Sequence, residues 1–148
     1  MTSARVVSVS RQIAAEPERI FGLIADPAQQ PRWDGNKNLA EAAAGQRVQQ
    51  VGDVFAMRLT NGGIRENHVV EFGEGRLIAW RPAEVGKQPP GHLWRWQLEP
   101  AGPGVTLVTH TYDWTELTDE KRLERARSTT ADNLLASLGK LAALAEEK

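Results

Sequence analysis

At 148 residues, with 18 basic and 19 acidic side chains and a formal net charge of -1, the chain has the size of one domain and no strong charge of either sign. It contains no cysteine, which excludes a disulfide, a thiol nucleophile and a thiolate metal site. A basic run of the kind that binds nucleic acid is missing, and Arg122, Arg125 and Arg127 are interpreted as the solvated face of a helix.

The first predicted element is a strand over residues 7–13, where apolar side chains alternate with polar ones. A helix over 17–26 follows, which begins at a proline and ends at Asp26-Pro27, since the residue before a proline avoids the α region. A short helix or turn then reaches Trp33, which we interpret as a packing anchor. From residue 38 to 114 the chain is predicted to form strands separated by glycine-rich turns.

Two strands in this stretch carry candidate ligand-binding residues, because every second side chain of a strand points to the same face. The side chains expected to face inward are Phe55, Met57 and Leu59 on the first strand, and Glu66, His68, Val70 and Phe72 on the second. A short strand containing Trp80 follows, and the pattern leaves open which way this indole points.

A hairpin predicted over 91–114 is the most informative stretch. One face carries His92, Trp94, Trp96 and Leu98 on the first arm, and Thr106, Val108, His110, Tyr112 and Trp114 on the second. A core face is usually aliphatic, whereas indole, imidazole and phenol groups bring polar atoms that need partners. We therefore predict that this face forms the wall of a cavity, with Trp94, Trp96, His110, Tyr112 and Trp114 as ligand-binding residues. Pairing Glu99 with Val105 across the turn would place Trp94 opposite His110.

One long helix is predicted to close the chain, beginning at a Thr118 cap. Its second half carries a leucine stripe that includes Leu138 and Leu141, which predicts firm packing. Its first half is less apolar, and two interpretations remain open: exposure to solvent, or a position over the mouth of a cavity. The helix residues assigned to the predicted binding site are Thr130, Asn133 and Leu134.

Two stretches resemble the polyketide cyclase/dehydrase branch of the START-like (SRPBCC) superfamily. Residues 10–33, with Ala25-Asp26-Pro27 and Trp33, look like the opening of that branch, and residues 98–114 with the helix after them are similar to its final hairpin and helix. The resemblance implies an α+β helix-grip fold over residues 1–148 as a single domain. In this fold a curved antiparallel sheet of about seven strands wraps around a long C-terminal helix, with two short helices after the first strand. It also implies a pocket for a hydrophobic small molecule.

Three functions from different classes remain open. We predict a binding or carrier protein for a hydrophobic, aromatic or polyketide- or lipid-like molecule. The first alternative is a polyketide cyclase/aromatase or dehydratase, with His110 or His68 as general base and Tyr112 as a hydrogen-bond donor. The second alternative is a protein-interaction module that responds to its ligand.

No cofactor and no metal site is predicted. The histidines and Glu66 lie on separate strands without the spacing of metal ligands, and no glycine-rich phosphate loop is present. No apolar run approaches the roughly 18 residues of a membrane span, and residues 1–9 lack the apolar core of a secretion signal. We expect a cytoplasmic monomer or homodimer that binds a hydrophobic small molecule, without nucleic acid and without stable membrane insertion.

Overall fold

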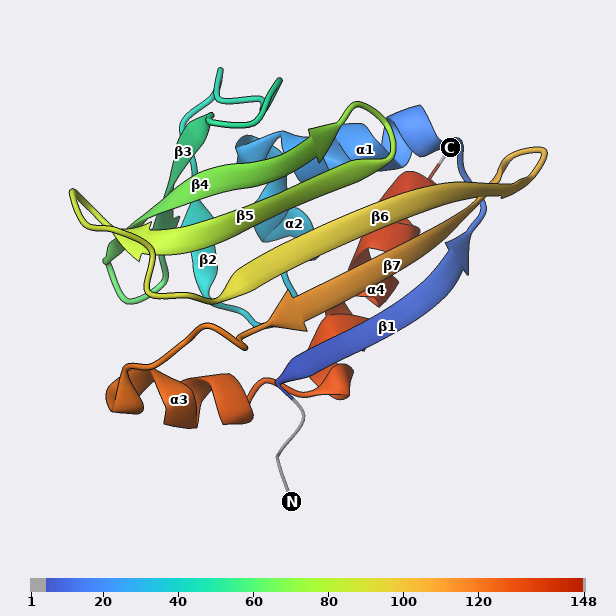
Figure 1. Ribbon diagram of the computed structural model, residues 1–148. Helices are drawn as coiled ribbons and strands as arrows, with labels where there is room; N and C mark the ends of the chain where they lie inside the picture. Colours follow the sequence, from blue (N-terminus) through green and yellow to red (C-terminus); the bar gives the residue numbers. More distant parts are fainter. Residues whose placement is uncertain (1–4, 148) are drawn as a thin grey trace.

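The computed structural model describes residues 5–147 and contains one seven-stranded sheet in the order β1-β7-β6-β5-β4-β3-β2 (Figure 1). Every neighbouring pair of strands is antiparallel. The strands are β1 (Val6–Ile13), β2 (Leu39–Glu41), β3 (Val54–Leu59), β4 (Ile64–Gly73), β5 (Leu77–Glu84), β6 (Leu93–Gly102) and β7 (Val105–Asp113). The α+β class and the two short helices after the first strand are confirmed.

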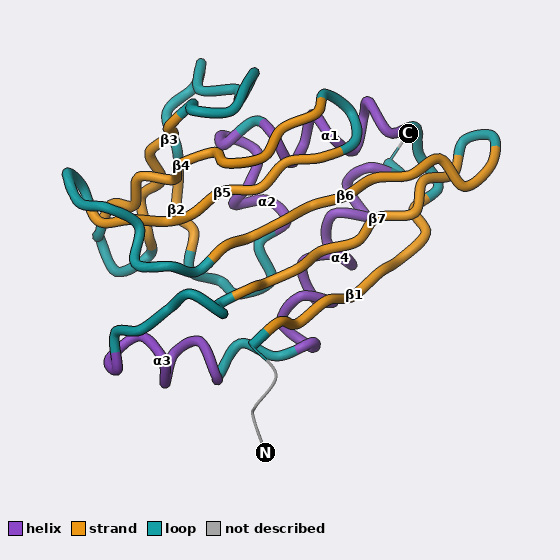
Figure 2. The backbone as a smooth tube through the Cα atoms, in the orientation of Figure 1, coloured by secondary structure: helices purple, strands orange, loops and turns teal. Residues whose placement is uncertain are grey.

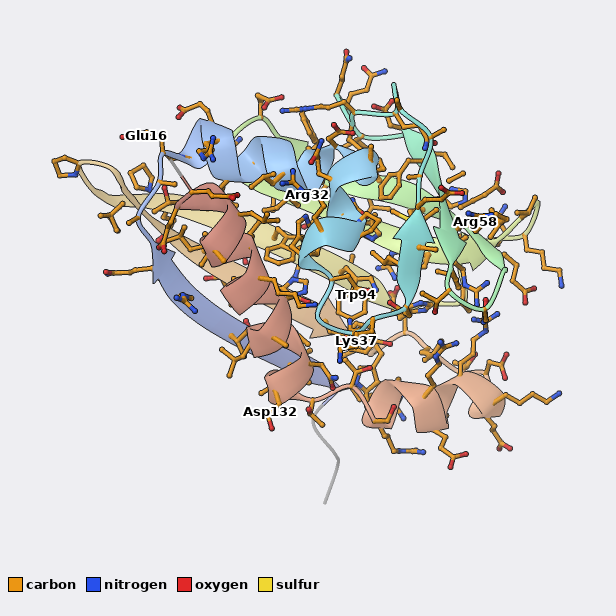
Figure 3. The ribbon with its side chains drawn as sticks, turned by 180° about the vertical axis from the view of Figure 1, so that it is seen from behind. Glu16, Arg32, Lys37, Arg58, Trp94 and Asp132 are labelled. Carbon is orange, nitrogen blue, oxygen red and sulfur yellow. The ribbon has the colours of Figure 1, made fainter. Side chains whose placement is uncertain are left out.

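Helices cover one face of the sheet, and Figure 3 views the molecule from that side. They are α1 (Pro17–Ala25), the 3-10 helix η1 (Pro27–Gln29), α2 (Gln30–Trp33), α3 (Glu120–Arg127) and α4 (Ala131–Ala145). The longest of them, α4, packs along β1 and also contacts α1 and α2. In contrast, α3 lies beyond the end of the sheet (Figure 1).

The predicted single closing helix is wrong, because α3 and α4 are separate helices joined by a short loop (Figure 2). Asp119, not Thr118, caps α3 by accepting a hydrogen bond from the Lys121 N–H at 3.0 Å. Thr130 adopts an extended backbone conformation and forms a capping box with Asn133 at the start of α4. A run of hydroxyl-bearing residues therefore ends one helix and begins the next, as such residues do when they hydrogen-bond to nearby backbone.

The register of the β6–β7 hairpin differs from the predicted one by two residues. The observed pairs include Trp94 with Tyr112, Trp96 with His110 and Leu98 with Val108. The slip arises because β6 continues to Gly102, so that the turn consists of Pro103 and Gly104 alone. Because a shift of two residues preserves the alternation of faces, the predicted inward face of the hairpin is the observed one.

A β-bulge in β4 overturns the predicted orientation of its first half. The pairing with β5 shifts between Val69 and Glu71, so Val70 has no partner and is 38% exposed. Phe72, beyond the bulge, packs against the core as expected. Before the bulge the faces are inverted, because one extra residue reverses the alternation. The side chains that face inward there are Arg65, Asn67 and Val69, and the inward placement of Glu66, His68 and Val70 is therefore wrong.

Candidate functional site

A cavity of about 320 Å³ lies between the sheet and the helices α2, α3 and α4. This volume is within the range of small-molecule sites, about 300–1,000 Å³. Its wall is built from β3 to β7, from the loop after α2, and from the facing sides of α3 and α4. Figure 3 places Trp94 between α2 and α3, behind the loop that carries Lys37.

Stacked aromatic rings form the wall on the sheet side. The rings of Trp96 and His110 are nearly parallel, with centroids 3.6 Å apart, and the ring of Trp94 is also nearly parallel to the histidine, at 5.5 Å between centroids. Tyr112 lies 4.3 Å from Trp94 between centroids, and Trp33 of α2 meets Trp96 edge-on at 5.1 Å. Because these rings hold one another in place, the wall is a flat and ordered surface on which a planar ligand can stack.

His110 is buried, and its ring nitrogens have different roles. Its Nδ1 lies 3.1 Å from the Arg95 carbonyl oxygen. Since a carbonyl oxygen only accepts, Nδ1 carries the proton and donates it, and Nε2 is an acceptor with no hydrogen-bond partner among residues 5–147. Burial lowers the pKa of His110 to about 3 against a small opposing effect of that backbone hydrogen bond. The ring is therefore neutral at physiological pH.

Two other polar groups of the wall differ from those of a solid core. The indole N–H of Trp96 and the Nδ1 of His92 are both buried, and neither has a hydrogen-bond partner in the described part of the chain. An unpaired buried donor or acceptor is unfavourable by about 1–3 kcal/mol, and such groups are concentrated at functional sites. Burial also raises the pKa of Tyr112 to about 12, so its hydroxyl keeps its proton.

Three arginines line the end of the cavity next to α3. Arg65 comes from β4, and Arg122 and Arg125 are one turn apart on α3. Burial, followed by the charges of Arg122 and Arg125, lowers the pKa of Arg65. Burial and the same positive charges lower the pKa of His92 to about 4. Arg122 and Arg125 thus line the cavity, which the interpretation as a solvated face did not include, although Arg125 is exposed as that interpretation expects.

A loop after α2 closes the side of the cavity opposite the sheet. The Asp34 carboxylate accepts hydrogen bonds from the backbone N–H groups of Asn36, Asn38 and Leu39, at 2.9 to 3.0 Å. Gly35 donates its N–H to the Ser137 hydroxyl of α4 at 2.9 Å. A Cβ at Gly35 would lie 2.5 Å from the Ser137 nitrogen, so only glycine permits this close approach to the helix.

About half of the predicted binding residues line the cavity, and the other half lie elsewhere. Those that line it are Met57, Leu59, Trp94, Trp96, His110, Tyr112 and Asn133. Phe55 lies behind the wall, edge-on to Trp80 at 5.4 Å, and Trp114 and Leu134 belong to a second apolar cluster with Leu117 and Ala126. Thr130 is the exposed cap of α4, and His68 and Val70 lie on the other face of the sheet.

Several lining residues were not among the predicted ones. The most important are Arg65, Asn67, Trp33, Trp80, Arg122, Arg125 and Thr129. Arg65 and Asn67 were missed because of the bulge in β4. Two lining residues could have been found from the sequence. His92 lies on the predicted inward face of the hairpin, and Thr129 lies in the less apolar half of the predicted closing helix. Ala126, Thr129 and Asn133 of that half line the cavity, as the mouth interpretation expects, whereas Thr130 is exposed.

Within residues 5–147 no group of three or more His, Cys, Asp or Glu side chains is arranged to hold a metal ion. In the same part of the chain, no helix is long and apolar enough to cross a bilayer. The lining side chains offer stacking, apolar contact, hydrogen bonding and positive charge.

Residues 4–146 match the protein family described as polyketide cyclase/dehydrase and lipid transport. The chain belongs to this family. Among curated relatives, the uncharacterized protein Rv0088 of Mycobacterium tuberculosis is 28% identical over 111 residues, which is 73% of this chain and 47% of the relative. The chain thus spans about half the length of the curated relatives that it matches.

Solved structures of the family's fold confirm the helix-grip architecture. Protein MLL2253 from Mesorhizobium loti is similar with a TM-score of 0.69 at 20% identity, covering 95% of this chain and 96% of that one. Protein CV1439 from Chromobacterium violaceum has a TM-score of 0.68 at 18% identity, covering 98% and 100%. The Aha1 dimer from Colwellia psychrerythraea has a TM-score of 0.66 at 20% identity, covering 95% and 96%. At these identities the likeness concerns the fold.

Proposed function

We propose that the protein binds a hydrophobic, ring-bearing small molecule non-covalently in the cavity, as a binding or carrier protein of its family. The observation that carries this proposal is the stacked wall of Trp94, Trp96 and His110 along a cavity of about 320 Å³. Aromatic faces of this size favour flat, apolar ligands, and a few polar groups orient them.

The state of the titratable groups supports binding rather than acid–base catalysis. A general base works best with a pKa near the operating pH. Burial lowers the pKa of His110 to about 3, and Tyr112 has a pKa of about 12. His68, the other candidate base, lies on the opposite face of the sheet. His110 Nε2 can therefore accept a hydrogen bond from a ligand, but it is a weak base.

The proposal is tested with N-phenyl-1-naphthylamine, a neutral apolar dye whose emission rises in apolar surroundings. We expect saturable binding of one dye per chain. Trp94→Ala removes one ring of the wall and is expected to weaken dye binding about tenfold. Val70→Ala is the matched control, since Val70 is exposed on the other face of the sheet. No saturable binding, or an equal loss in both variants, would contradict the proposal.

A further inference from the structure

The charge around the cavity is unevenly distributed. Although the chain has a net charge of -1, three arginines gather at the α3 end of the cavity. Arg122 has carboxylate neighbours, at 3.4 Å in Glu84 and at 3.5 Å in Asp119. Arg65 and Arg125 have no ion-pair partner among residues 5–147 and both line the cavity. Arg65 is opposite Glu84 in the β4–β5 pairing and is affected by its charge, but among the described residues no carboxylate lies within ion-pair distance of Arg65 or Arg125.

No side chain of the cavity wall neutralises this charge. Asp34 is the one acidic residue among the described lining residues, and both of its oxygens accept backbone hydrogen bonds within the loop after α2. Every charged group that affects His92 is an arginine, namely Arg122, Arg65, Arg125 and Arg81. The end of the cavity next to α3 is therefore a region of positive potential.

Moving inward from this end, the wall becomes apolar. His92, Trp94 and Trp96 follow one another at every second position of the chain that enters and forms β6. At about 3.4 Å per residue, the distance from the level of His92 to that of Trp96 is roughly 14 Å. Met57 and Leu59 of β3 complete the apolar part of the lining. A ligand that fills the cavity thus meets cations at one end and aromatic rings along its length.

We propose that the ligand is an amphipathic anion, whose carboxylate binds Arg65 and Arg125 at the mouth and whose ring-bearing apolar body packs against the aromatic wall at Trp94. Guanidinium groups match the planar geometry of a carboxylate and bind it with charge-assisted hydrogen bonds. Arg122 adds positive charge but is partly neutralised by Glu84 and Asp119. This inference rests on the proposed function and names the chemical class of its ligand.

The test compares 2-naphthoate with 2-naphthamide at pH 7.5 as competitors of N-phenyl-1-naphthylamine. The two compounds share a ring system and differ in charge, so their affinity ratio measures the effect of the anion. We expect naphthoate to bind about tenfold more tightly, because charge-assisted hydrogen bonds are stronger than neutral ones, although solvent partly screens them here. We also expect added salt to reduce this ratio, since the arginines lie near solvent.

The double variant Arg65→Gln/Arg125→Gln is expected to bind the two compounds equally, because it lacks the cations that favour the carboxylate. Arg127→Gln is the matched control, because Arg127 is on the same helix and does not line the cavity. This control should retain the preference for naphthoate. Equal binding of the two compounds by the wild-type protein, or the same loss of preference in both variants, would overturn the inference.

A second pair of compounds, decanoate and decanamide, distinguishes a carboxylate on an alkyl chain from a carboxylate on a ring system. Tighter binding of naphthoate than of decanoate supports a ring-bearing body, and the reverse order overturns that part of the proposal. Binding of the neutral dye distinguishes a failure of the proposed function from a failure of this inference. Loss of saturable dye binding contradicts the proposed function itself, whereas dye binding without a preference for the anion contradicts this inference alone.

Discussion

The two ends of the β6–β7 hairpin carry side chains on the same face and have different roles. At one end Leu98 and Val108 are opposite each other and almost completely buried in the main core, together with Ile13 and Leu138. At the other end Trp94 is opposite Tyr112, and these two side chains line the cavity instead of packing against α4. The alternation of a strand determines which side chains face inward, and the element above them determines whether they form a core or a site.

The chemistry of the residues follows this division. Aliphatic side chains fill space without polar atoms, and they make up the hairpin end that is covered by the second half of α4. Indole, imidazole and phenol groups occur where α4 gives way to α3 and the loop after α2. We therefore expect substitutions at the first end to reduce stability, and substitutions at the second end to change ligand affinity.

The largest expected effect is at the end of the hairpin that packs against α4. Leu138→Ala removes a side chain that is 0% exposed and should lower the free energy of unfolding by about 2–5 kcal/mol. Leu135→Ala on the same helix is the control, since Leu135 is 45% exposed and should change stability by less than about 0.5 kcal/mol. Urea denaturation followed by circular dichroism measures both. Similar losses at the two positions would mean that α4 does not pack as described.

A smaller effect is expected where the loop after α2 meets α4. Gly35→Ala forces a Cβ against the backbone of Ser137 and should destabilise the protein by about 1–3 kcal/mol. Gly22→Ala in α1 has open space around its Cβ and should stabilise the protein by about 0.5–1 kcal/mol. Thermal unfolding of the two variants checks this pair. A tolerated Gly35→Ala would contradict the close approach that shapes the cavity.

The buried histidines make stability depend on pH. Burial lowers the pKa of His110 to about 3 and that of His92 to about 4, below the unfolded value of 6.5. The unfolded chain therefore binds protons first, and stability falls as pH decreases below 6.5. Between pH 6.5 and 5.5 each histidine should reduce stability by about 1 kcal/mol. His110→Gln should remove about half of this loss in urea titrations at the two pH values, and an unchanged slope would contradict its neutral, buried state.

At the first turn of α4, the Asn133 side chain both caps the helix and lines the cavity. Asn133 accepts the Thr130 N–H at 2.8 Å and also lines the cavity. Asn133→Ala should therefore reduce stability by about 1 kcal/mol and also alter dye affinity. Thr129→Val, which keeps the side-chain shape, should change stability by less than about 0.5 kcal/mol while altering dye affinity. If Asn133→Ala changed affinity alone, the capping box would not contribute to stability.

The fold and the aromatic wall could be predicted from the sequence because they follow from local periodicity. Trp94, Trp96, His110 and Tyr112 alternate along two strands, and this pattern places them on one face whatever the exact register. The exact partners could not be predicted, because the turn is shorter than the glycine- and proline-rich sequence suggests. One extra residue in β4 likewise inverted the expected roles of Arg65 and His68.

The positive end of the cavity could not be predicted, because it depends on contacts distant in sequence. Arg122 and Arg125 lie on a polar helix that looks solvated when considered alone. The loop over residues 128–130 separates α3 from α4, and α3 then lies at the end of the cavity, where the charges of its arginines act on Arg65. Neither helical periodicity nor charge pattern contains this information.

The measurement that tests the central claim most directly is a titration of the ¹⁵N-labelled protein with N-phenyl-1-naphthylamine, followed through its indole N–H resonances. The chain has five tryptophans, of which Trp33, Trp80, Trp94 and Trp96 line the cavity and Trp114 does not. We predict that the resonances of Trp94 and Trp96 shift most and saturate together, while that of Trp114 stays in place. Shifts that are largest at Trp114, or no shift at any tryptophan, would contradict binding at the aromatic wall.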